Sequence, residues 1–385
     1  MSWPQVKLES VFEIARGGSP RPIDDYITDA DDGLNWISIK DASNSDKYIE
    51  KTKLKIKPEG LSRTRQVKPG DFLLTNSMSF GRPYIMKTSG CIHDGWLVLS
   101  GNPEKVDSDY FYHLLGSDLL KRRFSALAAG AVVKNLNIDL VKGVEIPLPP
   151  LPEQKRIAAI LDKADAIRRK RQQAIQLADD FLRAVFLDMF GDVIEGVENV
   201  VRFADIAVLD APMVDPRVDE YIDLIHIGPD RIEKKNGKLL PALTAREEGL
   251  ISKKFLFDDR YVLYSKIRPY LRKCAIAEGV GLCSADMYPV RPVEGFATKE
   301  FLWMLLLSDY FTAYTESLPA RANIPKLNRE ELEAFTLSLP DYSQQLKFSS
   351  IVRTTNIASQ RVVESAAYVD GAFESLSQKA FSGQL

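Results

Sequence analysis

The most regular pattern in the chain is a recurrence of apolar and small side chains at alternating steps of three and four residues. It occupies one segment from about Glu153 to Phe190 and a second in residues 342–385. This spacing places the side chains on one helix face and is typical of a coiled-coil seam. The predicted seam residues are Ile157, Ile160, Ile167, Phe181 and Val185 in the first helix and Phe348, Ile351, Val362, Val369 and Leu376 in the second.

Neither long helix carries enough apolar surface to be buried on all sides, so the simplest solution is that the two pack against each other. Arg171 fills one position of the first seam. An alternative stays open at this point, in which each helix docks on its own globular domain.

The chain repeats itself at a spacing of about 191 residues. Framework residues that correspond in order include Ser117-Asp118 with Ser308-Asp309, Gln154 with Gln345, Arg82-Pro83-Tyr84 with Arg268-Pro269-Tyr270, and Cys91-x-x-Asp94 with Cys283-x-x-Asp286. An ordered set of this kind indicates an internal duplication.

Each half begins with a mixed region in which Gly, Pro and Asn separate short apolar runs, a pattern that predicts short strands and loops. The predicted strands include Trp36–Lys40, Asp71–Thr75, Leu224–Ile227 and Tyr261–Ser265, and one short helix per half is predicted near Tyr110–Leu120 and Phe301–Phe311. A proline-rich hinge, residues 146–152, precedes the first long helix. We therefore predict a mixed α/β (α+β) fold with domains at 1–151 and 192–341 and long helices at 152–191 and 342–385.

Composition narrows the class of protein. The formal net charge is −2, so any binding to nucleic acid must use local basic patches. The three cysteines are scattered, which fits a reducing cytoplasm better than a disulfide framework. We expect no secretory signal and no membrane span, since the longest apolar run, Phe301–Leu307, is too short to cross a bilayer.

A search for catalytic chemistry finds little. The chain has no phosphate-binding glycine loop, and His93, His113 and His226 lie far apart with no metal ligands at suitable spacing. One string resembles a metal-dependent nuclease motif, Asp230 followed by Glu233 and Lys235. Only two residues separate the carboxylates, which favours a solvated charged turn, but a nuclease with a cryptic site remains the alternative function.

Positive charge concentrates between residues 51 and 57, where Lys53 and Lys55 share one face of a predicted strand with Lys51 and Lys57. Such a strand fits a phosphate backbone, and it equally fits an edge strand that uses lysine to block aggregation.

Polar loops at matched positions of the two halves are stronger candidates. They combine hydroxyl, amide and cationic groups, which are the groups that read base edges in the major groove. The candidate DNA contacts in these loops are Asn76, Ser77, Ser79, Arg82, Lys134 and Asn135 in the first half and Lys266, Arg268, Arg321, Asn323 and Lys326 in the second. Ordinary polar turns are the alternative, but recurrence at equivalent positions favours function and argues against a coiled-coil scaffold with no DNA role.

The hinge Ile146-Pro147-Leu148-Pro149-Pro150-Leu151-Pro152-Glu153-Gln154, running into a long helix, resembles that of specificity subunits from type I restriction–modification systems. The stretches Gly70–Leu74 and Val262–Lys273 resemble the same family. One departure is the second hinge, Leu339-Pro340-Asp341-Tyr342, which lacks the second proline and the glutamate.

The resemblance implies a non-catalytic chain with two target-recognition domains, held by an antiparallel coiled coil with pseudo-twofold symmetry. The protein would read a bipartite site in double-stranded DNA with an unread gap. It would assemble with two methyltransferase subunits that use S-adenosylmethionine and with a restriction and translocase subunit that uses ATP and Mg, and this chain would hold no metal and none of those cofactors.

Overall fold

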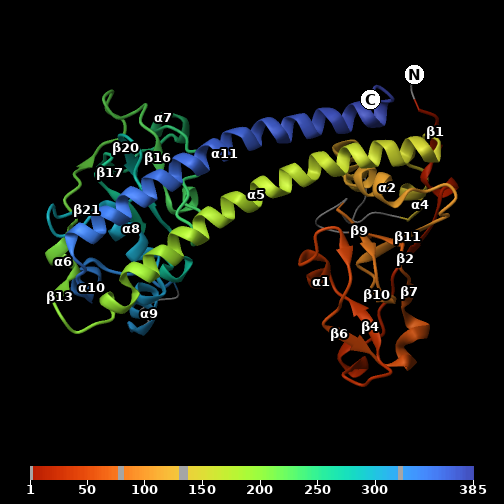
Figure 1. Cartoon of the computed structure of the whole chain (residues 1–385), viewed down its shortest axis with the longest axis horizontal. Coiled ribbons are helices and arrows are strands. Elements are labelled where there is room, and N and C mark those ends of the chain that lie inside the picture. Colours follow the sequence, from red (N-terminus) through yellow and green to blue (C-terminus); the bar gives the residue numbers. More distant parts are fainter. Residues whose placement is uncertain (1–2, 77–81, 130–137, 320–323) are drawn as a thin grey trace. The chain divides into compact units, whose positions relative to one another are not determined.

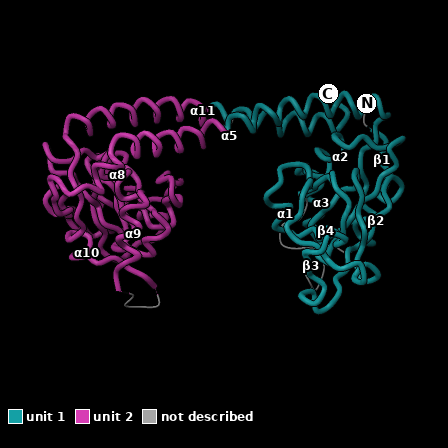
Figure 2. The backbone as a smooth tube through the Cα atoms, turned by 60° about the horizontal axis from the view of Figure 1, so that its bottom comes forward, with its two compact units in different colours: residues 1–171, 365–385 teal, residues 172–364 magenta. Residues whose placement is uncertain are grey.

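The computed structural model describes residues 3–76, 82–129, 138–319 and 324–385. The chain divides into two compact units (Figures 1 and 2). Unit 1 comprises residues 1–171 and 365–385, and unit 2 comprises residues 172–364. Two long helices, α5 (Leu151–Ile194) and α11 (Tyr342–Ser382), contribute one half to each unit. Within the described residues, no helix combines the length and the apolar character needed to cross a bilayer.

Unit 1 contains two five-stranded sheets and one short antiparallel pair. The first sheet has the order β2 (Phe12–Arg16), β11 (Trp96–Gly101), β8 (Phe72–Thr75), β9 (Pro83–Met86), β5 (Tyr48–Ile49). The second has the order β3 (Ile27–Thr28), β6 (Leu54–Ile56), β4 (Leu34–Ile37), β10 (Gly90–Ile92), β7 (Arg65–Val67). The short pair is β1 (Gln5–Lys7) with β12 (Glu145–Pro147).

Unit 2 repeats this plan with fewer strands. Its first sheet has the order β14 (Ala207–Val208), β21 (Met287–Pro292), β18 (Val262–Ser265), β19 (Cys274–Ile276). Its second sheet has the order β15 (Met213–Val214), β17 (Lys254–Phe257), β20 (Gly281–Cys283), β16 (His226–Ile227). The short pair is β13 (Val200–Arg202) with β22 (Thr336–Ser338). In both units one strand, β10 or β20, lies between a parallel and an antiparallel neighbour. This shared strand order confirms the duplication and the mixed α/β fold.

Short helices also recur in the two units. Unit 1 has α1 (Ile39–Ser43), α2 (Ser108–Leu115), α3 (Asp118–Ala129) and α4 (Ile138–Lys142). Unit 2 has α6 (Phe203–Ile206), α7 (Ala245–Glu248), α8 (Lys299–Leu307), α9 (Asp309–Ser317) and α10 (Arg329–Ala334). The prediction of one helix near Tyr110–Leu120 and one near Phe301–Phe311 was therefore wrong, because each region holds two. A serine separates them: Ser308 accepts the Phe311 amide at 3.1 Å and Ser117 accepts the Leu120 amide at 3.3 Å, so a new helix starts there.

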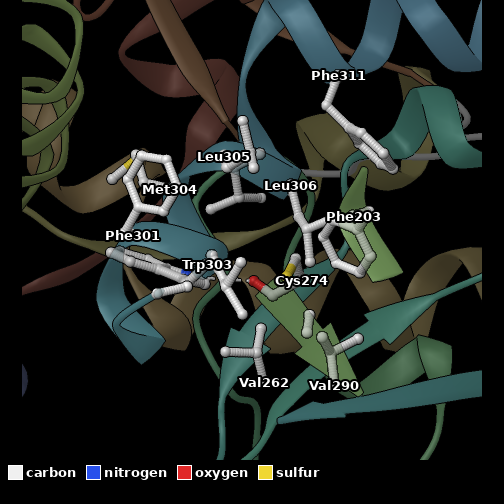
Figure 3. Close-up of a cluster of buried hydrophobic side chains, with 14 of the residues drawn as sticks. Phe203, Val262, Cys274, Val290, Phe301, Trp303, Met304, Leu305, Leu306 and Phe311 are labelled. Atoms are coloured by element: carbon white, nitrogen blue, oxygen red, sulfur yellow. Dashed lines mark hydrogen bonds between the residues drawn. The ribbon is translucent and has the colours of Figure 1, made fainter. Parts of the chain in front are cut away.

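Each unit has its own apolar core, and α8 is almost entirely enclosed in that of unit 2. Figure 3 shows its side chains packed against Val262, Cys274 and Val290 of the sheet, where the Trp303 indole donates to the Cys274 carbonyl at 3.1 Å. Both long helices contribute side chains to both cores. Unit 1 takes Ile157 and Leu161 with Ala380 and Phe381, and unit 2 takes Leu182, Phe186, Phe190 and Ile194 with Phe348 and Val352.

One glutamine at the start of each long helix is fully buried and bonded in the same way. The Gln154 carbonyl oxygen accepts the Asp107 amide at 2.9 Å, and its Nε2 donates to the Lys105 and Pro149 carbonyls, both at 2.9 Å. Gln345 binds Thr298, Phe296 and Pro340 in the same three ways, each at 3.0 Å. Asp107 and Thr298 are the N-caps of α2 and α8, so each glutamine joins a long helix to the helix layer of its domain.

The two long helices pair antiparallel within each unit. In unit 1, Arg156 near the start of α5 donates to the Leu385 carbonyl at 3.0 Å, and Arg168 lies 4.7 Å from the Phe373 ring centre. Arg171, further along α5, contacts Ser365, which is earlier in α11. In unit 2, Phe186 and Phe190 both contact Phe348, with ring centres 5.5 and 5.6 Å apart.

The helices also dock on their own domains, so both solutions left open by the sequence occur together. Ile157 and Phe348 are buried in the domain cores. Val185, Ile351 and Leu376 are partly buried against those cores, and Ile160, Val362 and Val369 are half-buried. The structure differs from the predicted seam at Ile167 and Phe181, which are 50% and 51% exposed. The face of α5 that docks on the domains is formed by other residues, such as Leu161 and Leu182.

We expect Gln345→Leu to loosen the joint in unit 2. The leucine fills a similar volume but leaves the Thr298 amide and two carbonyls without partners, which costs about 2–4 kcal/mol. Hydrogen exchange of the full chain should show faster exchange of the α8 amides and unchanged exchange of α2. Gln344→Leu, at the exposed neighbouring position, is the control. Equal protection of α8 in the two variants would contradict a joint made by Gln345.

Candidate nucleic-acid interface

In unit 2 the two predicted loops lie together, although 58 residues separate Arg268 from Lys326. The Arg268 amide donates to the Pro325 carbonyl at 2.8 Å, and the Leu327 amide donates to the Lys266 carbonyl at 2.9 Å. Ile267 and Lys326 form an isolated β-bridge. Three predicted DNA contacts, Lys266, Arg268 and Lys326, therefore belong to one surface at the end of β18.

The loop that carries Arg268 has an unusual backbone. Arg268 and Arg272 flank a short turn and both adopt the left-handed region, with φ of 52° and 50°. This conformation is unfavourable for arginine and needs support from the surroundings. Arg272 forms an ion pair with Asp309, and its carbonyl accepts the Lys235 amide at 3.1 Å. Strain of this kind collects at functional sites, and here it presents an exposed Arg268 side chain.

The lysines of this surface are close enough to influence each other. Burial, reinforced by the charge of Lys326, lowers the pKa of Lys266. Lys266 lies 5.1 Å from the Tyr288 ring centre, and Lys326 Nζ lies 3.6 Å from Asp286 Oδ1. The surface thus presents several cationic side chains beside the Asp286 carboxylate, an arrangement suited to a polyanion.

In unit 1 the predicted residues have different surroundings. Asn76 is only 2% exposed: its side-chain amide donates to the Asp94 carbonyl at 2.7 Å and its backbone amide donates to the Gly95 carbonyl at 3.1 Å. Asn76 therefore holds the base of its loop. Arg82 is exposed but donates to the Ser45 and Asp46 carbonyls at 3.3 Å, and it lies 5.2 Å from the Tyr84 ring centre. Ser77, Ser79, Lys134, Asn135, Arg321 and Asn323 lie outside the described residues.

The lysine segment is less regular than predicted. The strand β6 covers only Leu54–Ile56, and Leu54 is 42% exposed, so the second face is not fully apolar and buried. Lys53 is exposed, and Lys55 Nζ donates to the Ala30 carbonyl at 3.3 Å. Because β6 lies between β3 and β4, protection of a sheet edge does not explain these lysines.

Sequence reasoning missed a second basic cluster in unit 1. Arg16 Nε donates to the Asp94 carbonyl at 2.8 Å, and Arg21 lies 3.2 Å from the Asp94 carboxylate. Both arginines flank the pair Gly17-Gly18, and that pair was the signal in the sequence for a close approach of two backbone segments.

The nuclease-like string forms a charged turn. Ile232 and Leu239 are bridged, and the Glu233 carboxylate accepts the Asn236 side-chain amide at 2.5 Å. The Asp230 side chain is 74% exposed. Among the described residues, no three histidine, cysteine or carboxylate side chains lie together in a way that could hold a metal ion.

Comparisons with known proteins agree on one family. Residues 2–177 match the model of the type I restriction modification DNA specificity domain. The chain is 24% identical over 323 residues to the EcoDI specificity subunit of Escherichia coli, covering 74% of this chain and 71% of that protein. It is 30% identical over 181 residues to the putative MjaX specificity subunit of Methanocaldococcus jannaschii, covering 46% of this chain and 40% of that protein.

Residues 2–177 belong to the DNA specificity domain of type I restriction–modification systems, and the chain resembles specificity subunits of those systems along most of its length. A solved structure of the S subunit from M. genitalium has the same fold, with a TM-score of 0.56 at 14% identity over 99% of this chain and 96% of that one. A chain from a study of complex assembly in a type I system matches with a TM-score of 0.54 at 17% identity, covering 100% of this chain and 98% of that one.

The matched domain is a DNA specificity domain and the relatives are specificity subunits, so the comparisons support recognition of DNA target sites as the function. The comparisons do not support the nuclease alternative. We therefore consider the basic loops as candidate DNA contacts.

We expect Arg268→Ala to weaken binding to the preferred DNA site by about 1–3 kcal/mol if the guanidinium contacts a base. Arg82→Ala should cost less, because Arg82 already donates to two carbonyls of its own unit. Arg260→Ala, at the other end of β18, is the control. Titrations on preferred and random DNA at several salt concentrations measure the effect. A uniform loss with a shallower salt slope would indicate a phosphate contact, and no loss would exclude the loop from the interface.

Proposed function

We propose that this specificity subunit reads a DNA site in two parts, one with each recognition domain, and that α5 and α11 set the length of the unread gap. The observation that carries the proposal is the shared strand order of the two units combined with different side chains at equivalent loop positions. Asn76 of unit 1 corresponds to Lys266 of unit 2, for example, at the end of equivalent strands. One framework with two loop chemistries is suited to two different half-sites.

The proposal assigns residues 1–151 and 192–341 to recognition and residues 152–191 and 342–385 to spacing. Lys266, Arg268 and Lys326 are its best-supported DNA contacts, because they share one basic surface. Lys53, Lys55 and Arg82 are further contacts in unit 1. Asn76 acts by holding its loop.

The proposed partners are double-stranded DNA, two methyltransferase subunits that use S-adenosylmethionine, and a restriction and translocase subunit that uses ATP and Mg. Exposed apolar side chains along the long helices support docking of a partner, since Leu177 is 66%, Ile357 57% and Tyr368 83% exposed. We place the assembly in the cytoplasm, where the three buried free cysteines suit a reducing environment.

Site selection from random DNA tests the proposal directly. The full chain, assembled with its methyltransferase subunits, should enrich two short conserved blocks separated by a gap of fixed length. Enrichment of one block, or of none, would overturn it.

The spacer role makes a separate prediction. Inserting four residues after Ala174 in α5 and four after Ser365 in α11 should lengthen both helices by about 6 Å. The preferred gap should grow by one or two base pairs, at roughly 3.4 Å each, while both blocks stay the same. Four residues inserted after Gly279, in an exposed turn with open space around it, are the control. An unchanged gap after the paired insertion would exclude the helices as the spacer.

A further inference from the structure

An aspartate side chain recurs in both units at the base of the loop that follows β8 in unit 1 and β18 in unit 2. Asp94 lies in the turn between β10 and β11, and Asp286 lies in the equivalent turn between β20 and β21. The residue that follows the neighbouring strand bonds to this turn in both units. In unit 1 the Asn76 amide donates to the Gly95 carbonyl at 3.1 Å, and in unit 2 the Lys266 amide donates to the Asp286 carbonyl at 3.1 Å. The two carboxylates are 44% and 46% exposed, so each is on the surface at a matched position.

In unit 1 the Asp94 carboxylate collects groups from a distant segment. Ser19 Oγ donates to Oδ1 at 3.1 Å and Arg21 Nη2 donates to Oδ2 at 3.2 Å. Arg16 and Asn76 bind the Asp94 carbonyl oxygen. Although burial opposes it, the hydrogen bond from Ser19 and the charge of Arg21 lower the pKa of Asp94, so the group stays ionised near neutral pH.

Two glycines allow this approach. The Gly17 amide donates to the Trp96 carbonyl at 3.0 Å and the Gly18 amide donates to the Ile92 carbonyl at 3.1 Å. A Cβ on Gly17 would collide with the His93 carbonyl, and one on Gly18 would collide with the Arg63 carbonyl. The segment from Arg16 to Arg21 is therefore fixed on the turn by backbone contacts, and Asp94 fixes its side chains.

In unit 2 a different segment supplies the cation. Lys326 Nζ lies 3.6 Å from Asp286 Oδ1, and Lys326 reaches this position through its bridge to Ile267. Arg21 precedes β3, a strand of the second sheet of unit 1, whereas Lys326 follows α9 of unit 2. The carboxylate is the part retained by both units, and the source of the cation differs between them.

A carboxylate within a basic DNA-binding surface has two physical effects. It holds a long cationic side chain in one geometry, which lowers the entropy lost when that side chain contacts a base. Its charge also repels phosphates, so it weakens binding in registers where the backbone comes close. Both effects favour the correct sequence over random DNA.

We propose that Asp94 and Asp286 are equivalent specificity-determining positioning residues, which orient Arg21 and Lys326 and penalise binding to non-cognate DNA. This inference rests on the proposed reading of a two-part site. It deepens that function, because it names in each half a carboxylate that raises the preference for the correct sequence while it lowers the affinity for random DNA.

The test uses Asp94→Asn and Asp286→Asn in the full chain assembled with its methyltransferase subunits. Each variant should lose about tenfold or more in preference for its own block of the site, and the other block should stay unchanged. Affinity for random DNA should rise by roughly twofold to fivefold, because one repulsive charge is removed. Glu104→Gln and Glu294→Gln remove one exposed charge at the far ends of β11 and β21, and they should leave the preference intact.

A purely structural role predicts a different result, in which affinities for cognate and random DNA fall together. That outcome would overturn the inference, and so would an unchanged preference in both aspartate variants. Arg21→Gln and Lys326→Gln provide a second test that leaves the carboxylates in place. Each should relax the same block as its aspartate partner while lowering affinity for random DNA, and relaxation of the opposite block or of neither would overturn the pairing. If the unmodified assembly shows no two-part preference, the proposed function itself fails.

Discussion

Two buried glutamines determine how each recognition fold is joined to its long helix. Gln154 and Gln345 each bind one backbone amide at the N-cap of a domain helix and two carbonyls, one of them from the hinge. A side chain with all of its hydrogen-bonding groups used and no contact with water has one favourable orientation. The direction in which each long helix leaves its domain is thereby fixed, and the placement of its apolar residues follows from that direction.

The long helices divide their apolar surface between two kinds of partner. At one end of α5, Ile157 and Leu161 complete the core of unit 1, and at the other end Phe186 and Phe190 complete the core of unit 2. Contacts such as Arg168 with Phe373 then join α5 to α11. A continuous heptad seam is unnecessary, because each domain core already anchors the helix ends. This explains how a seam can contain Arg171 and leave Phe181 half-exposed.

The duplication, the mixed fold and the long helices could be predicted because they depend on framework residues that repeat along the sequence. The interface was harder to predict, because a sequence does not tell whether a polar side chain faces solvent or satisfies the backbone. Asn76 has the chemistry of a base-reading residue, yet it is buried on the Asp94 carbonyl. Arg16 and Arg21 were missed because their position depends on the backbone contact between Gly17 and Trp96, which lies 79 residues further along the chain (96 − 17).

The two ends of the chain meet in unit 1, where the Trp3 indole donates to the Ala380 carbonyl at 2.7 Å and Phe381 contacts Tyr110. Unit 2 is one uninterrupted stretch, residues 172–364, whereas unit 1 needs residues 365–385 to complete its core. Residues 365–385 are synthesised after residues 172–364, so the core of unit 1 can be completed only after every residue of unit 2 has been made. Unit 2 can close as soon as its own residues emerge, while the first domain to be made waits for the final turns of α11. A chain cut after residue 364 would keep every residue of unit 2 and would lack residues that the core of unit 1 uses.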